Sequence, residues 1–165
     1  MTVDPLPPIG LNRVLGLCEV LDDRGGREDV SRLARELSYR LGDLLLAIRA
    51  AEILGLVSTP GADVVLEPLG KKVVDGDVNV KKAVLEDQMR RHSLFRFFLD
   101  LLGNAPGGEL PRDTILEELA ILLPNENPKT AFQTLVSWGR FGDVFGYSRD
   151  TGRFFLQHAP PRAQS

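Results

Sequence analysis

Three side chains in this 165-residue sequence could bind a transition metal through sulfur or imidazole nitrogen: Cys18, His92 and His158. A structural zinc site usually takes four such ligands at short spacings, and these three lie far apart in sequence. Cys18 falls on an apolar helical stripe, where a thiol usually packs as a small hydrophobic group. Nothing local supplies the neighbouring base and the electropositive setting that would activate it as a nucleophile. We therefore expect neither a metal site nor thiol catalysis.

Carboxylates and a lysine-rich segment are the next candidates for chemistry. Asp22–Asp23 and Glu117–Glu118 are consecutive pairs, and adjacent helical residues do not converge on one point. Gly70-Lys71-Lys72 lacks the upstream glycine and the following hydroxyl residue of a phosphate-binding loop. These groups are expected to lie on solvated surface, so the sequence predicts no enzymatic activity and no cofactor.

Basic and aromatic side chains offer a surface for a partner instead. The predicted interaction surface consists of Lys81, Lys82, Arg90, Arg91, Arg96, Phe97, Phe154 and Phe155. Glu86 and Asp87 could balance the basic part of this set through helical pairs. Phe154 and Phe155 are consecutive, so one of them must point away from the core if they lie on a strand.

Composition narrows the class of protein. The net charge of -3 argues against a protein that wraps a polyanion, and 43% hydrophobic residues suffice for a core. A single cysteine excludes an intramolecular disulfide and favours a reducing compartment. No apolar run approaches the roughly 20 residues that span a bilayer, and the first residues do not read as a signal peptide. We expect a cytoplasmic location without direct membrane insertion.

Hydrophobic periodicity predicts which elements position these side chains. In the first half it predicts a helix over 9–22, a short helix capped by Asp29, and a packed helix over 41–54. A hairpin that turns at 59–63 and a short helix from Pro68 follow. In the second half it predicts one long helical segment over 78–102, helices over 112–122 and 129–144, and a hairpin over 145–156.

The order of three helices and a hairpin therefore occurs twice. We predict a mainly α fold with two small β-hairpins, arranged as tandem winged-helix-like halves, each a helix-turn-helix followed by a wing. The predicted organisation is an extended segment over 1–8, a first winged-helix-like domain over 9–76, a second over 77–157, and a loose tail over 158–165.

DNA binding is the main rival to a protein partner. In a helix-turn-helix the second helix of the motif enters the major groove, which here is the helix over 41–54. Its expected outward residues are Arg40, Asp43, Ala47, Arg49 and Ala50, of which Arg40 and Arg49 are the candidate DNA contacts. The loop over 58–63 contains no lysine or arginine, although phosphate neutralisation dominates affinity for DNA. DNA is thus possible but less favoured.

Three segments carry a family resemblance: GLCEVLDDRGGREDVSRLARELSYRLGDLLLAIRAAEILGLV, LEPLGKK and TLVSWGRFGDVFGYSRDTGRFFL. In this order and spacing they resemble the AAA-associated domain at the C-terminus of ATP-binding subunits of nitrate/sulfonate/bicarbonate-type ABC transporters. The resemblance covers about Ile9 to Leu156.

The resemblance implies a non-catalytic regulatory or protein-interaction module whose partner is an ABC transporter ATP-binding subunit. A winged-helix DNA-binding transcriptional regulator is the alternative. A small-molecule sensor with a ligand between the halves is a third option, and a homodimer is also compatible with the sequence.

Overall fold

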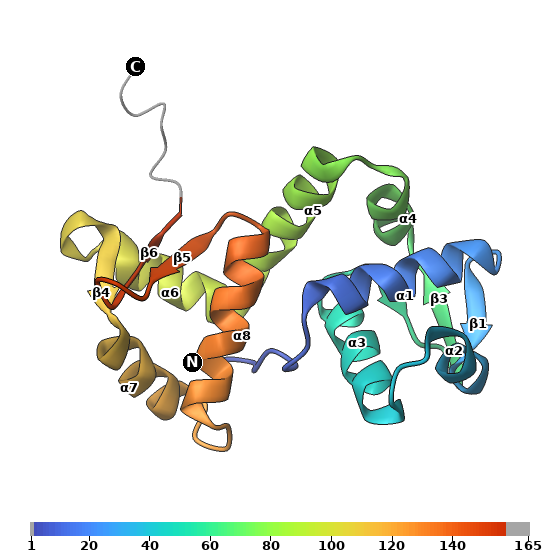
Figure 1. Ribbon diagram of the computed structural model, residues 1–165, viewed down its shortest axis with the longest axis horizontal. Helices are drawn as coiled ribbons and strands as arrows, with labels where there is room; N and C mark the ends of the chain where they lie inside the picture. Colours follow the sequence, from blue (N-terminus) through green and yellow to red (C-terminus); the bar gives the residue numbers. More distant parts are fainter. Residues whose placement is uncertain (1, 158–165) are drawn as a thin grey trace. The chain divides into compact units, whose positions relative to one another are not determined.

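The computed structural model describes residues 2–157 (Figure 1). Its contacts divide this part of the chain into two compact units. The N-unit comprises residues 7–88, and the C-unit comprises residues 2–6 together with 89–157. The division falls between residues 88 and 89, inside the helix α5 (Val78–Arg91), whereas the predicted domains over 9–76 and 77–157 meet just before this helix. The predicted tail over 158–165 lies outside the described residues.

The N-unit alternates short helices with the strands of one small sheet. Its elements are α1 (Leu11–Asp23), β1 (Arg27–Asp29), α2 (Val30–Leu37), α3 (Leu41–Ile53), β2 (Val57–Ser58), β3 (Asp63–Leu66), α4 (Pro68–Asp75) and most of α5. The strands form an antiparallel sheet in the order β1-β3-β2. As predicted, Asp29 caps α2, since its carboxylate accepts a hydrogen bond from the Arg32 amide at 2.9 Å.

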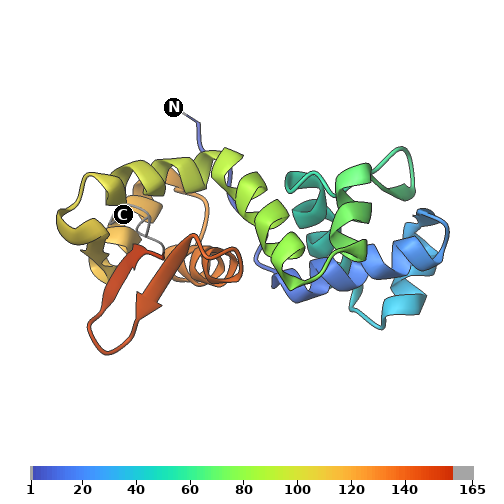
Figure 2. The same ribbon diagram turned by 90° about the horizontal axis from the view of Figure 1, so that it is seen from above.

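The C-unit repeats the same order of elements. They are α6 (Ser93–Gly103), a 3₁₀ turn (Pro106–Gly108), β4 (Glu109–Pro111), α7 (Arg112–Leu122), α8 (Pro128–Phe141), β5 (Phe145–Ser148) and β6 (Arg153–Leu156). The sheet order β4-β6-β5 matches that of the first sheet. Figure 2 shows β5 and β6 as a hairpin that projects from the helices of this unit.

The prediction of a mainly helical chain is confirmed, but each predicted hairpin is part of a three-stranded sheet. The additional strands are β1 and β4, which pair with β3 and β6. Both are three residues long, and β1 consists only of charged residues, so neither produces an alternating pattern. With these strands, each unit has the order helix, strand, helix, helix, hairpin, which is compatible with the winged-helix-like interpretation.

The predicted continuous helical segment over 78–102 is wrong, because the structure contains two helices there. α5 ends at Arg91, and His92 adopts extended backbone with φ -77° and ψ 138° as the N-cap of α6. Its Nδ1 accepts a hydrogen bond from the Leu94 amide at 3.1 Å. The apolar pattern continues across the break, since both helices bury side chains such as Leu85 and Phe95. Periodicity alone therefore could not reveal it.

The buried face of α3 also differs from the predicted one. Leu41 and Leu45 belong to the helical apolar pattern that predicts the packed helix over 41–54, but they are 58% and 50% exposed. Ala47 and Ala50 were expected outside but are fully buried. α3 packs against α1, α2 and β2. The apolar face of α3 is thus rotated relative to the one that its leucines suggest.

The first residues of the chain belong to the C-unit. The side chains of Val3 and Leu6 are buried, and the Asp4 amide donates a hydrogen bond to the Ser93 hydroxyl at 3.0 Å. The C-unit is therefore assembled from two separate stretches of sequence, and the N-unit lies between them in the chain.

Aromatic rings form much of the core of the C-unit. The Phe145 ring stacks on Phe95 with centroids 5.3 Å apart and meets Phe154 at 4.9 Å. Phe154 also contacts Phe132 of α8 at 5.8 Å. These contacts hold the β5–β6 hairpin against α6 and α8.

Gly70 in α4 occupies a position where the backbone leaves no room for a side chain. A Cβ atom there would lie 2.3 Å from the carbonyl oxygen of Leu56 and 2.6 Å from Leu66. We expect Gly70→Ala to lower the free energy of unfolding by about 1–3 kcal/mol, because the added methyl forces neighbouring groups apart. Urea denaturation followed by circular dichroism measures this change.

Gly42→Ala is the matched control, since a Cβ at Gly42 of α3 meets nothing within 4 Å. Alanine favours a helix over glycine by up to about 1 kcal/mol, so this variant should be as stable as the wild type or more stable. Equal destabilisation by both substitutions would contradict the packing argument.

His92 makes stability depend on pH. Burial lowers the pKa of the imidazole, while the Asp4 carboxylate opposes this effect. The unfolded chain therefore binds a proton at a higher pH than the folded chain, and stability is lost as pH falls below about 6.5, the ordinary histidine pKa. His92→Asn keeps a capping acceptor without the titration. We expect thermal melts of this variant to vary less between neutral pH and pH 5 than those of the wild type, and an unchanged dependence would contradict the assignment.

Candidate functional site

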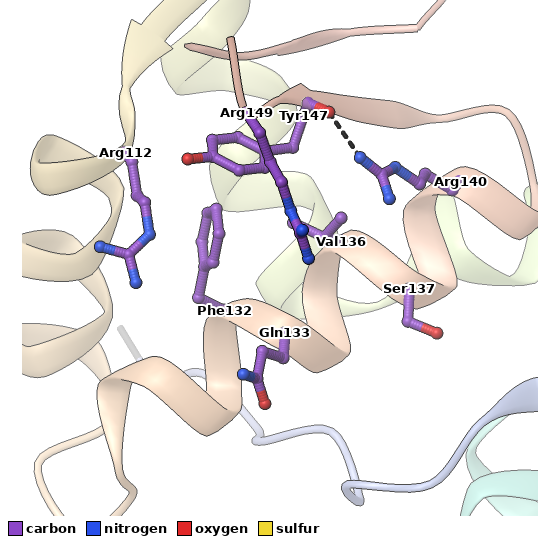
Figure 3. Close-up of a pocket in the computed structure, with 8 residues that line it drawn as sticks. All are labelled: Arg112, Phe132, Gln133, Val136, Ser137, Arg140, Tyr147 and Arg149. Carbon is purple, nitrogen blue, oxygen red and sulfur yellow. Dashed lines mark hydrogen bonds between the residues drawn. The ribbon is translucent and has the colours of Figure 1, made fainter. Parts of the chain in front are cut away.

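The C-unit contains a pocket of about 530 Å3 between α8, the first residue of α7 and the β5–β6 hairpin (Figure 3). We call it the α8 pocket. Its lining consists of Arg112, Phe132, Gln133, Val136, Ser137, Arg140, Tyr147 and Arg149. All of these residues belong to the C-unit, so the pocket is complete within one compact unit.

The apolar side of the α8 pocket comes from the inward face of α8. Phe132 and Val136 are one helical turn apart, and both are buried. The Phe132 ring meets the Tyr147 ring of β5 edge to face, with centroids 5.2 Å apart. Because Phe132 also contacts Phe154 of the core, its position is fixed by packing, independently of any ligand.

Three guanidinium groups from three different elements surround this apolar surface. The Cζ atom of Arg112 lies 5.5 Å from the centroid of the Phe132 ring, within the range of a cation–π interaction. Arg140, in the last turn of α8, donates a hydrogen bond to the carbonyl oxygen of Tyr147. Arg149, in the turn of the hairpin, extends toward α8 in Figure 3. Helix and hairpin thus both contribute positive charge to one concavity.

The chemistry of the α8 pocket is that of a site for anions. None of its lining residues is acidic, and arginine presents donors in a planar arrangement that matches carboxylate and phosphate oxygens. Gln133 and Ser137 are exposed on α8 and add an amide and a hydroxyl. The lining also lacks His, Cys, Asp and Glu, so these side chains can bind a ligand but offer no general base to attack one.

The candidate DNA contacts of the first half lie elsewhere. Arg40 is the N-cap of α3 in the N-unit, and Arg49 is exposed on the same helix. The positions near Arg49 that were expected to share its surface, Ala47 and Ala50, are buried. The exposed surface of α3 instead includes Leu41 and Leu45. Apart from the two arginines, Asp43 is the one polar residue among those expected to face outward on this helix. Its carboxylate pairs with Arg13 at 3.2 Å.

The basic part of the predicted interaction surface is divided between the two units. Lys81 and Lys82 belong to the N-unit, whereas Arg90, Arg91 and Arg96 belong to the C-unit. The ammonium group of Lys81 donates to the Gly76 carbonyl at 2.6 Å. Lys82, Arg90 and Arg91 also interact with other residues of the chain. Arg96 is exposed on α6.

The aromatic part of that set needs a correction. Phe154 is fully buried in the core, so it does not belong to an interaction surface. Phe155 is only partly buried and lies over Gly146 of the neighbouring strand, as the alternation of side chains on a strand requires. Phe97 is partly buried beside Phe98, with ring centroids 5.1 Å apart.

Sequence reasoning did not find Arg112, Arg140 and Arg149 as a group. The loop of the first hairpin contains no lysine or arginine, whereas the loop of the second hairpin contains Arg149. This difference between the loops is a signal that the sequence offers. Arg140 precedes Arg149 by nine positions on the predicted helix. The sequence gave no such signal for Arg112. This residue directly follows β4, whose pairing with β6 brings it to the pocket, and β4 is too short to recognise from sequence.

Gly70-Lys71-Lys72 lies in the middle of α4, where Gly70 is buried and only the two lysines are exposed as expected. Lys71 pairs with Asp22 at 2.8 Å. Within residues 2–157, no three His, Cys, Asp or Glu side chains gather in a way that could hold a metal ion. His158 lies outside the described residues. No helix in the described part of the chain has both the length and the apolar character needed to cross a membrane.

Cys18 is fully buried in α1. Burial, with a smaller contribution from the Glu19 carboxylate, raises the pKa of its thiol to about 12. Since the thiolate is the reactive form, we expect the folded protein to resist a thiol reagent at pH 8 and the urea-unfolded protein to react fully. Absorbance after addition of a disulfide reagent measures this. Rapid labelling of the folded protein would contradict the assigned burial.

Comparison with known proteins places this architecture in a family. A search of curated proteins and a search of solved structures found no match. The family model of the C-terminal AAA-associated domain matches residues 31–148, which begin in α2 and end in β5. The match covers most of the chain and includes segments of both units, as the sequence resemblance implied. The chain therefore belongs to the C-terminal AAA-associated domain family.

Proposed function

We propose that this chain is a non-catalytic regulatory and protein-interaction module that works in the cytoplasm with the ATP-binding subunit of an ABC-type transporter. The observation that carries the proposal is the family match over residues 31–148. The name of the family, C-terminal AAA-associated domain, implies association with such an ATPase, and a module of this kind would contribute contacts to its partner.

The side chains of the chain support an accessory role. The one cysteine is buried and has a raised pKa. The α8 pocket is lined by arginines, aromatic rings, a valine and neutral polar groups, a set that binds and orients anionic groups. Such a site suits regulation through binding better than turnover of a substrate.

The alternative of a transcriptional regulator that reads DNA through α3 gains little support. The helix exposes Leu41 and Leu45, and Arg49 has no second cation in the loop at 59–62. A protein that binds DNA needs several phosphate contacts, because these dominate its affinity. The N-unit therefore suits a protein partner better than DNA.

The proposal is tested by mixing the full chain with an ABC ATP-binding subunit from the same organism. We expect the two to co-elute in size-exclusion chromatography, and we expect the chain to change the subunit's rate of ATP hydrolysis while hydrolysing no ATP itself. An unrelated P-loop ATPase serves as the control. Failure to co-elute together with an unchanged hydrolysis rate would contradict the proposal.

A further inference from the structure

We propose that the C-unit binds duplex DNA, with α8 in the major groove and the β5–β6 hairpin on the phosphate backbone. This inference does not depend on association with a transport ATPase. It starts from the position of the α8 pocket between a helix and a hairpin. α7 and α8 are consecutive packed helices followed by the hairpin, the arrangement in which the second helix of the pair presents its outer face to DNA.

The outer face of α8 carries the side chains that this role requires. Its exposed residues are Lys129, Thr130, Gln133, Ser137 and Arg140. Lys129, Gln133, Ser137 and Arg140 follow one another at intervals of three or four, so they share one side of the helix. The sequence of α8 contains no acidic residue. Glutamine can bind both edge atoms of an adenine, and serine can donate to or accept from a base.

The arginines of the α8 pocket supply contacts to phosphate on the flank of that helix. Arg140 lies at the end of α8, Arg149 in the turn of the hairpin, and Arg112 at the start of α7. A backbone that passes between helix and hairpin would meet guanidinium groups from both sides. The hydrogen bond from Arg140 to the Tyr147 carbonyl connects α8 to the hairpin, so the two sides keep their spacing.

The N-unit provides an internal comparison, because the same order of elements carries different side chains. The exposed positions of its corresponding helix α3 include Leu41, Leu45 and Glu52, and the corresponding loop at 59–62 lacks cations. The scaffold alone therefore does not favour DNA. In the C-unit, α7, α8 and the β5–β6 hairpin each contribute an arginine to the α8 pocket. This difference is why we assign DNA binding to the C-unit.

An acidic protein segment could also contact arginines, but it would leave Gln133 and Ser137 without a specific role. Their position on the outer face of α8, beside Arg140, fits base edges flanked by phosphates. With a chain charge of -3, binding must depend on these local cations. We expect it to weaken steeply with salt.

The test uses the full chain and a fluorescein-labelled, mixed-sequence DNA duplex, with binding measured by anisotropy over a range of salt concentrations. Each phosphate contact contributes about -0.9 to the slope of log K against log salt. We therefore expect the double variant Arg140→Ala/Arg149→Ala to bind more weakly and to lose about 2 units of slope. The single variant Arg149→Ala should lose about 1 unit of this slope. Because it leaves the Arg140 hydrogen bond in place, it remains informative if the double variant does not fold.

Two matched controls separate the α8 pocket from general charge. Arg96→Ala removes an exposed cation of the same unit outside the pocket, and Arg49→Ala removes one from α3. Both should retain the affinity and slope of the wild type. The inference is overturned if the wild type does not bind the duplex at low salt, or if the pocket variants and the controls lose affinity equally. Binding of poly-glutamate but not of DNA would also overturn it, in favour of an acidic protein partner.

Discussion

The burial of Phe154 is the constraint on which the geometry of the C-unit depends. Its ring lies among those of Phe98, Phe132 and Phe145, and these come from α6, α8 and β5. One side chain therefore fixes the hairpin against two helices at once. The distance between the cations of α8 and those of the hairpin follows from this packing, because a core at crystal-like density leaves the hairpin little freedom to shift. The buried aromatic cluster therefore determines the shape of the α8 pocket at the surface.

The two units show how one scaffold can carry different surfaces. Both place a three-stranded antiparallel sheet beside helices in the same order. α3 exposes leucines, whereas α8 exposes lysine, glutamine, serine and arginine. A fold of this kind does not by itself define a function, which resides in the side chains placed on it. The outer face of α3 combines leucines with charges of both signs, whereas that of α8 carries only basic and neutral polar side chains.

The helices were largely predictable because an amphipathic helix records its burial as a period of three to four residues. Most predicted ends agree with the structure to within about two residues, the usual ambiguity of helix ends. The break at His92 left no mark, since the apolar pattern continues through it, and Ala47 and Ala50 carry too little hydrophobic signal to reveal which side of α3 packs on α1. β1 and β4 exist only because a partner strand is present. The α8 pocket joins three elements through such long-range pairing, which is why its arginines did not emerge as a group.

The chain order of the C-unit has a consequence for biosynthesis. Residues 2–6 are synthesised before the N-unit, but Val3 and Leu6 are buried in a unit whose remaining residues begin at 89. The whole N-unit is therefore made before these side chains can find their native environment. Since domains generally fold as units during synthesis, the N-unit can complete its own core while both of its neighbouring segments are still unfolded. The C-unit, including the hairpin that carries Arg149, can complete its core only after the N-unit has been synthesised.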